Sequence, residues 1–189
     1  NVGNDFDGLV TIRGADIALT DADSLAIGSM NASGSLTLSA TGNITDTGSV
    51  VVGTTTSLAS TAGSITLDSV GNEFTGAVSL SGINATLRDT TGTSLDTVSL
   101  TGNLVLTAGG AITGTAIIDV DGTTALSAAG QNISLTNAAN DFTGQVTVTN
   151  AKSIDLDDVG GLNFKGSATG TNADLSLTTT GALTLVDRV

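Results

Sequence analysis

A five-residue phrase recurs in this chain at a fixed interval of 68 positions, and no other feature restricts the fold as strongly. The phrase is Asn4-Asp5-Phe6-Asp7-Gly8 in its first copy, and it returns as Asn72-Glu73-Phe74-Thr75-Gly76 and as Asn140-Asp141-Phe142-Thr143-Gly144. Self-similarity at a fixed period is the signature of a repeat architecture. We therefore divide a single domain, residues 1–189, into repeats 4–71, 72–139 and 140–189, the last of them partial.

A shorter period lies inside the long one. Five related phrases begin at Leu38, Leu58, Leu106, Leu126 and Leu177, and each continues through a Gly to Ile or Leu followed by Thr or Ser. Neighbouring copies, such as those at Leu38 and Leu58 or at Leu106 and Leu126, are about 20 positions apart. Apolar and polar residues alternate within each unit, and Gly, Asn and Asp separate the alternating segments. This pattern predicts short, half-buried β-strands joined by tight turns.

A unit of about 20 residues with about three strands matches one rung of a β-solenoid, in which inward residues stack on those of the next rung about 4.8 Å away. We expect an all-β parallel solenoid of about eight rungs, each of roughly 20–25 residues, forming a rod about 40 Å long. A string of immunoglobulin-like sandwiches is the alternative. That fold needs about 100 residues per domain and usually a Trp or a Tyr, and the chain has neither.

Composition limits the partners. The chain carries 18 acidic and 5 basic residues, a net charge of −13. Nucleic acid is excluded as a partner because its recognition requires a basic footprint, and anionic membrane surfaces are disfavoured for the same reason. No apolar run approaches the length of a membrane span, so we expect no membrane insertion. The absence of Cys removes disulfides and thiolate metal sites.

The residue types present argue against catalysis. Without His or Cys the familiar nucleophilic triads cannot form. The basic residues are Arg13, Arg88, Lys152, Lys165 and Arg188. Carboxylates are plentiful, but neither a basic cluster nor aromatic platforms for sugar rings accompany them. We therefore expect no enzyme, no catalytic residue and no cofactor, and a polysaccharide-acting β-helix is kept as an alternative.

Two acidic pairs are candidate metal ligands. Asp119 and Asp121 lie two residues apart, as do Asp155 and Asp157, so each pair shares one face of a strand and projects outward if the residues between them point inward. Two such carboxylates can contribute to a weak calcium site, which needs six to eight oxygens. The simpler interpretation, which we favour, is a solvated acidic face that maintains solubility and discourages lateral association.

Threonine and serine occupy many outward strand positions. Stacked Thr on a flat face can bind ice, which gives an alternative function of a different class. Val51 and Val105 interrupt the pattern, and Thr also suits strands and cross-strand ladders in general. The outward residues in question are Thr11, Thr37, Thr66, Ser79, Thr147 and Ser176.

The recurring members of the five-residue phrase are predicted to be structural. Phe6, Phe74 and Phe142 are expected to fill a corner of the core. The Asn residues that precede them are expected either to satisfy turn backbone or to adopt a left-handed conformation, and the Gly residues that follow are expected to allow a bend.

The phrases Gly34 to Thr45 and Asn140 to Val148 resemble the strand repeats of filamentous-haemagglutinin-like large exoproteins. This resemblance covers essentially the whole chain and implies a right-handed parallel β-helix. It also implies a Gram-negative source, export by two-partner secretion or as an autotransporter passenger, and a role in adhesion or biofilm formation. The secretion domain of that family carries Asn-Pro motifs, and the chain has no Pro, so no residue is assigned to that domain.

The resulting expectation is a structural stalk segment of a secreted adhesin at the bacterial cell surface, belonging to a much longer chain. Its partner is an unknown receptor or matrix, and lateral self-association between copies is a second possible contact.

Overall fold

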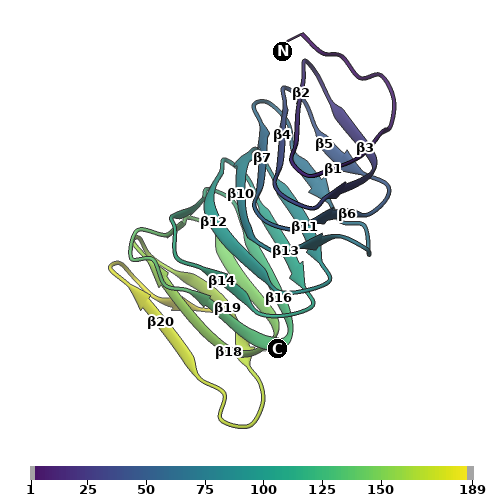
Figure 1. Cartoon of the computed structure of the whole chain (residues 1–189). Coiled ribbons are helices and arrows are strands. Elements are labelled where there is room, and N and C mark those ends of the chain that lie inside the picture. The colour runs from purple at the N-terminus through teal and green to yellow at the C-terminus, as the bar shows by residue number, and fades with distance from the viewer. Residues whose placement is uncertain (1–2, 187–189) are drawn as a thin grey trace.

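The structure is a computed structural model, and it describes residues 3–186. These residues form twenty-one β-strands and no helix. The strands pair in parallel and wind around one axis from the N-terminal to the C-terminal end (Figure 1). The expected parallel β-helix is confirmed, and it has about nine turns, one more than the sequence predicted.

The strands are β1 (Val10–Gly14), β2 (Ile17–Asp21), β3 (Leu25–Ala32), β4 (Leu36–Ala40), β5 (Ile44–Asp46), β6 (Val50–Val52), β7 (Thr56–Ser60), β8 (Ile65–Leu67), β9 (Glu73–Phe74), β10 (Ala77–Gly82), β11 (Ala85–Asp89), β12 (Thr93–Leu100), β13 (Leu104–Ala108), β14 (Ile112–Gly114), β15 (Ile118–Val120), β16 (Thr124–Leu135), β17 (Asp141–Phe142), β18 (Gln145–Asp158), β19 (Asn163–Ala168), β20 (Leu175–Thr179) and β21 (Thr184–Leu185).

Each turn has two sides, which we call side A and side B. Side A is a ladder of β2, β4, β7, β10, β12, then β14 with β15, the second half of β16 with β17, the second half of β18, and β20. Side B is a ladder of β1, β3, then β5 with β6, β8 with β9, β11, β13, the first halves of β16 and β18, β19 and β21.

The stacking expected from the shorter sequence period is present. Leu38 pairs with Leu58, and Leu58 pairs in turn with Leu80. Successive rungs vary in length, because Val78 pairs with Leu95, 17 positions later, whereas Val52 pairs with Phe74, 22 positions later. The rungs therefore lie in the lower part of the predicted range or below it.

A side is either one straight strand or two short arms, and the phase of the apolar residues decides which. In β4 the inward residues keep an unbroken period of two, so the strand stays straight throughout. In β3 the buried residues Leu25 and Ile27 are followed by Met30 and Ala32, so the period breaks between Ile27 and Met30. The two halves of β3 then pair with separate strands, β5 and β6.

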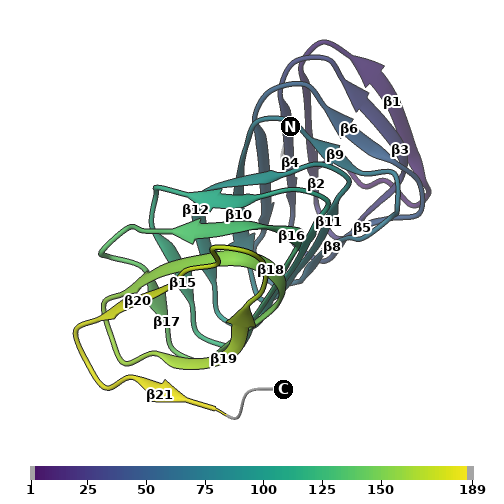
Figure 2. The same ribbon diagram turned by 90° about the horizontal axis from the view of Figure 1, so that it is seen from below.

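Straight and bent sides change places half-way along the rod. Side A is straight from β2 to β10, bent from β12 to β17 and straight again in the second half of β18 and in β20. Side B is bent from β3 to β9 and straight from β11 onward. Figure 2 shows the consequence, since the arms β6 and β9 project at one lateral edge and the arms β15 and β17 at the opposite edge.

One 68-residue repeat therefore makes about three and a half turns. From β4 to β13, its counterpart in the next repeat, the chain passes along seven sides and arrives on the other side of the rod. Leu38 consequently stacks on Leu58, but its counterpart Leu106 stacks on Leu87 and Leu126 in the opposite ladder. Two repeats complete seven whole turns.

The interior is a column of stacked aliphatic side chains with aromatic side chains at a few points. Phe74, Phe142 and Phe164 are the largest fully buried side chains, and Phe6 is half-buried against the core. This confirms the prediction that Phe fills the core. Each fully buried Leu or Val contributes about 1.5–3 kcal/mol to the free energy of unfolding, and these contributions accumulate along the column.

The Asn of the five-residue phrase replaces a missing ladder partner. Asn72 and Asn140 are fully buried, and their Oδ1 atoms accept hydrogen bonds from the backbone N–H groups of Val50 (2.8 Å) and Ile118 (2.9 Å) in the rung before. The Asn140 Nδ2 group donates to the Leu135 carbonyl oxygen. The predicted backbone-satisfying role of these Asn residues is confirmed.

Glycine lines one corner because successive rungs touch there. A Cβ atom on Gly122 would lie 2.6 Å from the carbonyl carbon of Gly102, and a Cβ atom on Gly144 would lie 2.5 Å from that of Gly122. Backbone atoms cannot move aside as the end of a flexible side chain can, so the corner admits only glycine.

The rung at the C-terminal end has less cover than the others. Leu175, Leu183 and Leu185 are 41%, 44% and 59% exposed, although Leu175 continues the inward column of Ile154. No further rung of the described chain packs against them.

We expect Leu106→Asp to unfold several rungs. Leu106 is 1% exposed, and an unpaired charge buried at this point costs several kcal/mol, about 3–5 or more. Thr37→Ser removes one methyl group from an exposed position, so its effect should stay within about 0.5 kcal/mol. Denaturant unfolding of both variants measures the difference, and equal shifts of the two midpoints would contradict the assigned core.

We expect Asn140→Ala to lower the free energy of unfolding by about 1–3 kcal/mol, because the Ile118 N–H group then lies buried without an acceptor. Asn103→Ala is the matched control. The Asn103 Oδ1 atom also accepts a hydrogen bond from a backbone N–H group one rung away, that of Thr123, but at an exposed corner where water replaces it. Thermal unfolding should separate the two variants.

Candidate functional site

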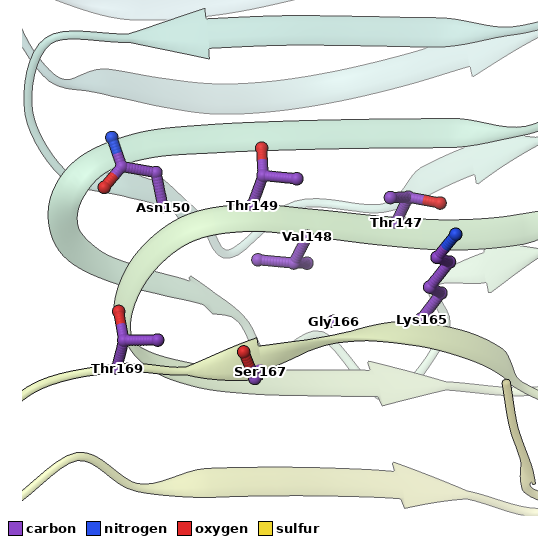
Figure 3. A pocket seen from close by; sticks show the side chains of 8 residues that line it. All are labelled: Thr147, Val148, Thr149, Asn150, Lys165, Gly166, Ser167 and Thr169. Atoms are coloured by element: carbon purple, nitrogen blue, oxygen red, sulfur yellow. The ribbon is translucent and has the colours of Figure 1, made fainter. Parts of the chain in front are cut away.

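A hollow in the described surface lies on side B, between β18 and β19. Its volume is about 350 Å³, and it is open to solvent. Figure 3 shows Thr147, Thr149 and Asn150 along one strand, with Lys165 and Ser167 on the next. The complete lining is Thr147, Val148, Thr149, Asn150, Lys165, Gly166, Ser167 and Thr169.

A break in the ladder creates this hollow. Val148 pairs with Gly166, but the next pair is Ala151 with Ala168, so two residues of β18 face one residue of β19. Asn150 adopts a positive φ of 53° at this bulge. Gly166 adopts a φ of 154°, and a Cβ atom there would lie 2.6 Å from the Val148 carbonyl oxygen, so the position requires glycine.

The hollow continues along side B as a shallow trough. Thr107, Ser127 and Thr149 stack in adjacent rungs, and Arg88 precedes Thr107 in the same column. We call these four residues, with Lys165 and Ser167, the hydroxyl trough. Its side chains can donate and accept hydrogen bonds with a polar ligand, and its two cations, Arg88 and Lys165, belong to separate rungs. No lining residue of the hollow is an acid, a His or a Cys.

The first predicted acidic pair lies on the bent half of side A. Asp119 and Asp121 are exposed, while Ile118 and Val120 beside and between them are buried, so the carboxylates project outward as predicted. Asp119 also pairs with Asp141 of the next rung. The pKa of Asp119 lies above its usual value, because burial penalises the charged carboxylate and because Asp121 and Asp141 add like charge.

The second pair lies on another arm. Asp155 and Asp157 are half-buried in the second half of β18, and Asp155 stacks between Ser134 and Ser176. Within residues 3–186, neither pair belongs to a group of three carboxylates whose oxygen atoms lie within 4.8 Å of one another. Calcium binding by these pairs therefore stays a prediction without a third carboxylate to support it.

The outward hydroxyl residues form short columns. Thr66, one of the predicted outward residues, belongs to a column of three Thr residues, Thr45, Thr66 and Thr86. Ala26 and Val105 lie at the two ends of this column. The predicted residue Thr37 stacks between Ala18 and Ser57. This mixture lacks the paired, regular Thr columns that would favour ice binding.

The basic residues are dispersed. Arg13, Arg88 and Lys152 are exposed, and Lys165 is half-buried in the hollow. Arg188 lies outside the described residues. Residues 3–186 contain no helix long and apolar enough to span a membrane.

Comparison with known families gives one match, and the match fits the repeat seen in the ladder. The model of a family described as "Repeats of unknown function (DUF5649)" matches residues 14–81 and 82–149. The chain belongs to this family. No curated protein and no solved structure matches it.

The two family repeats begin at Gly14 and Gly82, again 68 positions apart, so the family unit has the length of the repeat found in the sequence with a shifted starting point. Each unit starts at the last residue of a strand, β1 or β10. Since the unit makes about three and a half turns, an outward residue of the first family repeat and its counterpart 68 positions later lie on opposite sides of the rod.

Sequence reasoning missed the hydroxyl trough. The outward position of Thr147 in the adjoining hollow was recognised, but it was not connected with Asn150, Lys165 and Gly166. The signal that was available is the insertion after Asn150, where the third repeat departs from the register of the first two.

We expect Asp119→Asn to raise the melting temperature at pH 7. Because the pKa of Asp119 is raised in the folded chain, its ionised carboxylate destabilises the fold at pH values above this pKa. The penalty disappears below the ordinary value of 3.8, where the carboxyl group is protonated in both the folded and the unfolded chain. The gain should therefore vanish near pH 3. Asp174→Asn, a charge removal at an exposed position on another rung, serves as the control. An equal gain at both pH values would contradict the electrostatic cause.

Proposed function

We propose that this chain is a stalk segment of a secreted bacterial surface adhesin and that it takes part in no catalysis. The main support is the parallel ladder, which joins about nine turns of the described chain along one axis without a change of architecture. Such a ladder resists bending and extension because every inner rung is hydrogen-bonded to two neighbours. The resemblance of its strand repeats to those of large exoproteins supports the biological setting.

The repeat supports the same role. At about 4.8 Å per rung, three and a half turns add about 17 Å of length for each 68-residue repeat. Further copies can extend the rod along the same axis, because the core continues from one repeat into the next through equivalent pairs. Leu58 pairs with Leu80 across the first junction, and their counterparts Leu126 and Val148 pair across the second. Length is then set by repeat number.

The acidic surface fits a projecting spacer. With a net charge of −13, neighbouring rods repel each other at long range, and the receptor-binding site of the adhesin is assigned to another part of the longer protein. Lateral contact with matrix or with other copies is assigned to the hydroxyl trough, where Arg88 and Lys165 reduce the negative charge.

The test is a deletion in the full-length gene of the source bacterium. Removing residues 14–149 takes out both family repeats and seven whole turns, so the chain on either side can rejoin in register. We expect normal export, a rod shortened by about 34 Å in electron micrographs, and weaker cell aggregation and surface attachment. Deleting the whole gene should abolish both phenotypes.

Three results would contradict the proposal. They are retention of the protein inside the cell, unchanged attachment after deletion of the gene, and turnover of a polysaccharide by the purified chain. Thermal hysteresis of ice growth would replace the proposal by the ice-binding alternative.

A further inference from the structure

We propose that Asp5, Asp21 and Asp23 form a binding site for a divalent cation, calcium by its chemistry, at the N-terminal end of the solenoid. The three carboxylates each offer an oxygen atom, and these atoms lie within 4.8 Å of one another. Asp21 ends β2, and Asp23 follows it in the corner toward β3, while Asp5 belongs to the first five-residue phrase.

The second observation is a buried carboxylate oxygen without a hydrogen-bond partner on Asp21, a member of this group. Asp21 is 2% exposed, its Oδ2 atom is fully buried, and no donor of the described chain reaches that atom. Its Oδ1 atom accepts one long hydrogen bond, of 3.4 Å, from the Asp23 N–H group. A buried anionic oxygen without a donor is costly, and a bound cation removes that cost.

The second repeat shows how the same position is satisfied without a cation. Asp89 is the counterpart of Asp21, 68 positions later, and it is equally buried. Its Oδ1 atom accepts hydrogen bonds from the Thr91 N–H and hydroxyl groups, both at 2.9 Å. Its Oδ2 atom accepts one from the Thr93 hydroxyl group at 3.0 Å.

The first repeat replaces both hydroxyl donors. Thr91 corresponds to Asp23 and Thr93 to Leu25, so one donor becomes a carboxylate and the other becomes an aliphatic core residue. The change removes the hydrogen bonds that a buried carboxylate needs and adds a further negative oxygen beside it. Neighbouring carboxylates without hydrogen-bond donors can be neutralised by a hard cation, which binds their oxygen atoms directly.

The electrostatics agree with this geometry. The pKa of Asp5 lies above its usual value, chiefly because the Asp23 carboxylate repels its negative charge, with smaller effects from Asp7, burial and Asp21. A divalent cation between these groups would reverse the repulsion.

Calcium suits the group better than magnesium. Calcium accepts six to eight oxygen ligands in flexible geometry, whereas magnesium requires a near-ideal octahedron. Asp5 and Asp23 are exposed, so water can complete the shell, and a site of this kind binds calcium in the range of about 0.1–1 mM.

The cation would fasten the N-terminal segment to the first turn. Residues 4–8 precede β1, and Asn4 already accepts a hydrogen bond from the Ala22 N–H group and donates one to the Thr20 carbonyl oxygen. A bond through the cation from Asp5 to Asp21 and Asp23 adds a third connection at the same place.

The test is calorimetric titration of CaCl₂ into the 189-residue chain at about 150 mM salt, where distant surface charges are screened. We expect one site with a dissociation constant of about 0.1–1 mM. Asp5→Asn and Asp23→Thr should each weaken binding at least about tenfold. Asp23→Thr restores the residue that serves Asp89, so it should also raise the melting temperature of the calcium-free chain.

Asp68→Asn is the matched control, because it removes one exposed negative charge far along the chain and should leave the affinity unchanged. Hydrogen exchange should show that calcium slows the exchange of the Ala22 and Ser24 amides in the wild-type chain and not in Asp5→Asn. Asp5 is exposed, so this variant keeps the core intact.

Two results would overturn the proposal. One is failure of the wild-type chain to bind calcium at about 10 mM CaCl₂, well above the expected dissociation constant. The other is equal binding by the wild type, Asp5→Asn and Asp23→Thr, which would place any bound calcium elsewhere on the acidic surface.

Discussion

The parallel hydrogen-bonded contact between consecutive rungs is the interaction on which the rest of this molecule depends. It brings Leu38, Leu58 and Leu80 into one column although they lie far apart in the sequence. With aromatics at only 2% of residues, the interior gains its stability from the number of such contacts rather than from any large side chain. Asn72 and Asn140 show how a polar group is accommodated in this interior, because each replaces a missing ladder partner.

The sequence predicts the stacking but not the path that the chain takes around the axis. The shorter period places Leu38 under Leu58 because both lie in the same phrase and alternate with polar neighbours. The exchange of straight and bent sides depends on single-residue breaks in period, such as that between Ile27 and Met30, and on the succession of two straight strands, β10 and β11. A repeat length alone does not distinguish three turns from three and a half.

The candidate sites were predictable to different degrees. Alternation was enough to place Asp119 and Asp121 outward, since the buried residues beside them fix the direction of the strand. The hydroxyl trough depends on a bulge at Asn150, and the group of Asp5, Asp21 and Asp23 depends on a corner that brings residues 16 or more positions apart together. Contacts across corners leave no periodic trace in the sequence. A position-by-position comparison of the repeats, which sets Asp23 against Thr91, could have revealed the group of Asp5, Asp21 and Asp23 from the sequence.

The half-turn offset gives repeat number a second meaning besides length. Adding or removing one 68-residue unit turns every surface residue beyond the junction to the opposite side of the solenoid axis. Adding or removing two units leaves the orientation of these residues about the axis unchanged. A population of related rods with odd and even copy numbers would thus present the same features to opposite neighbours.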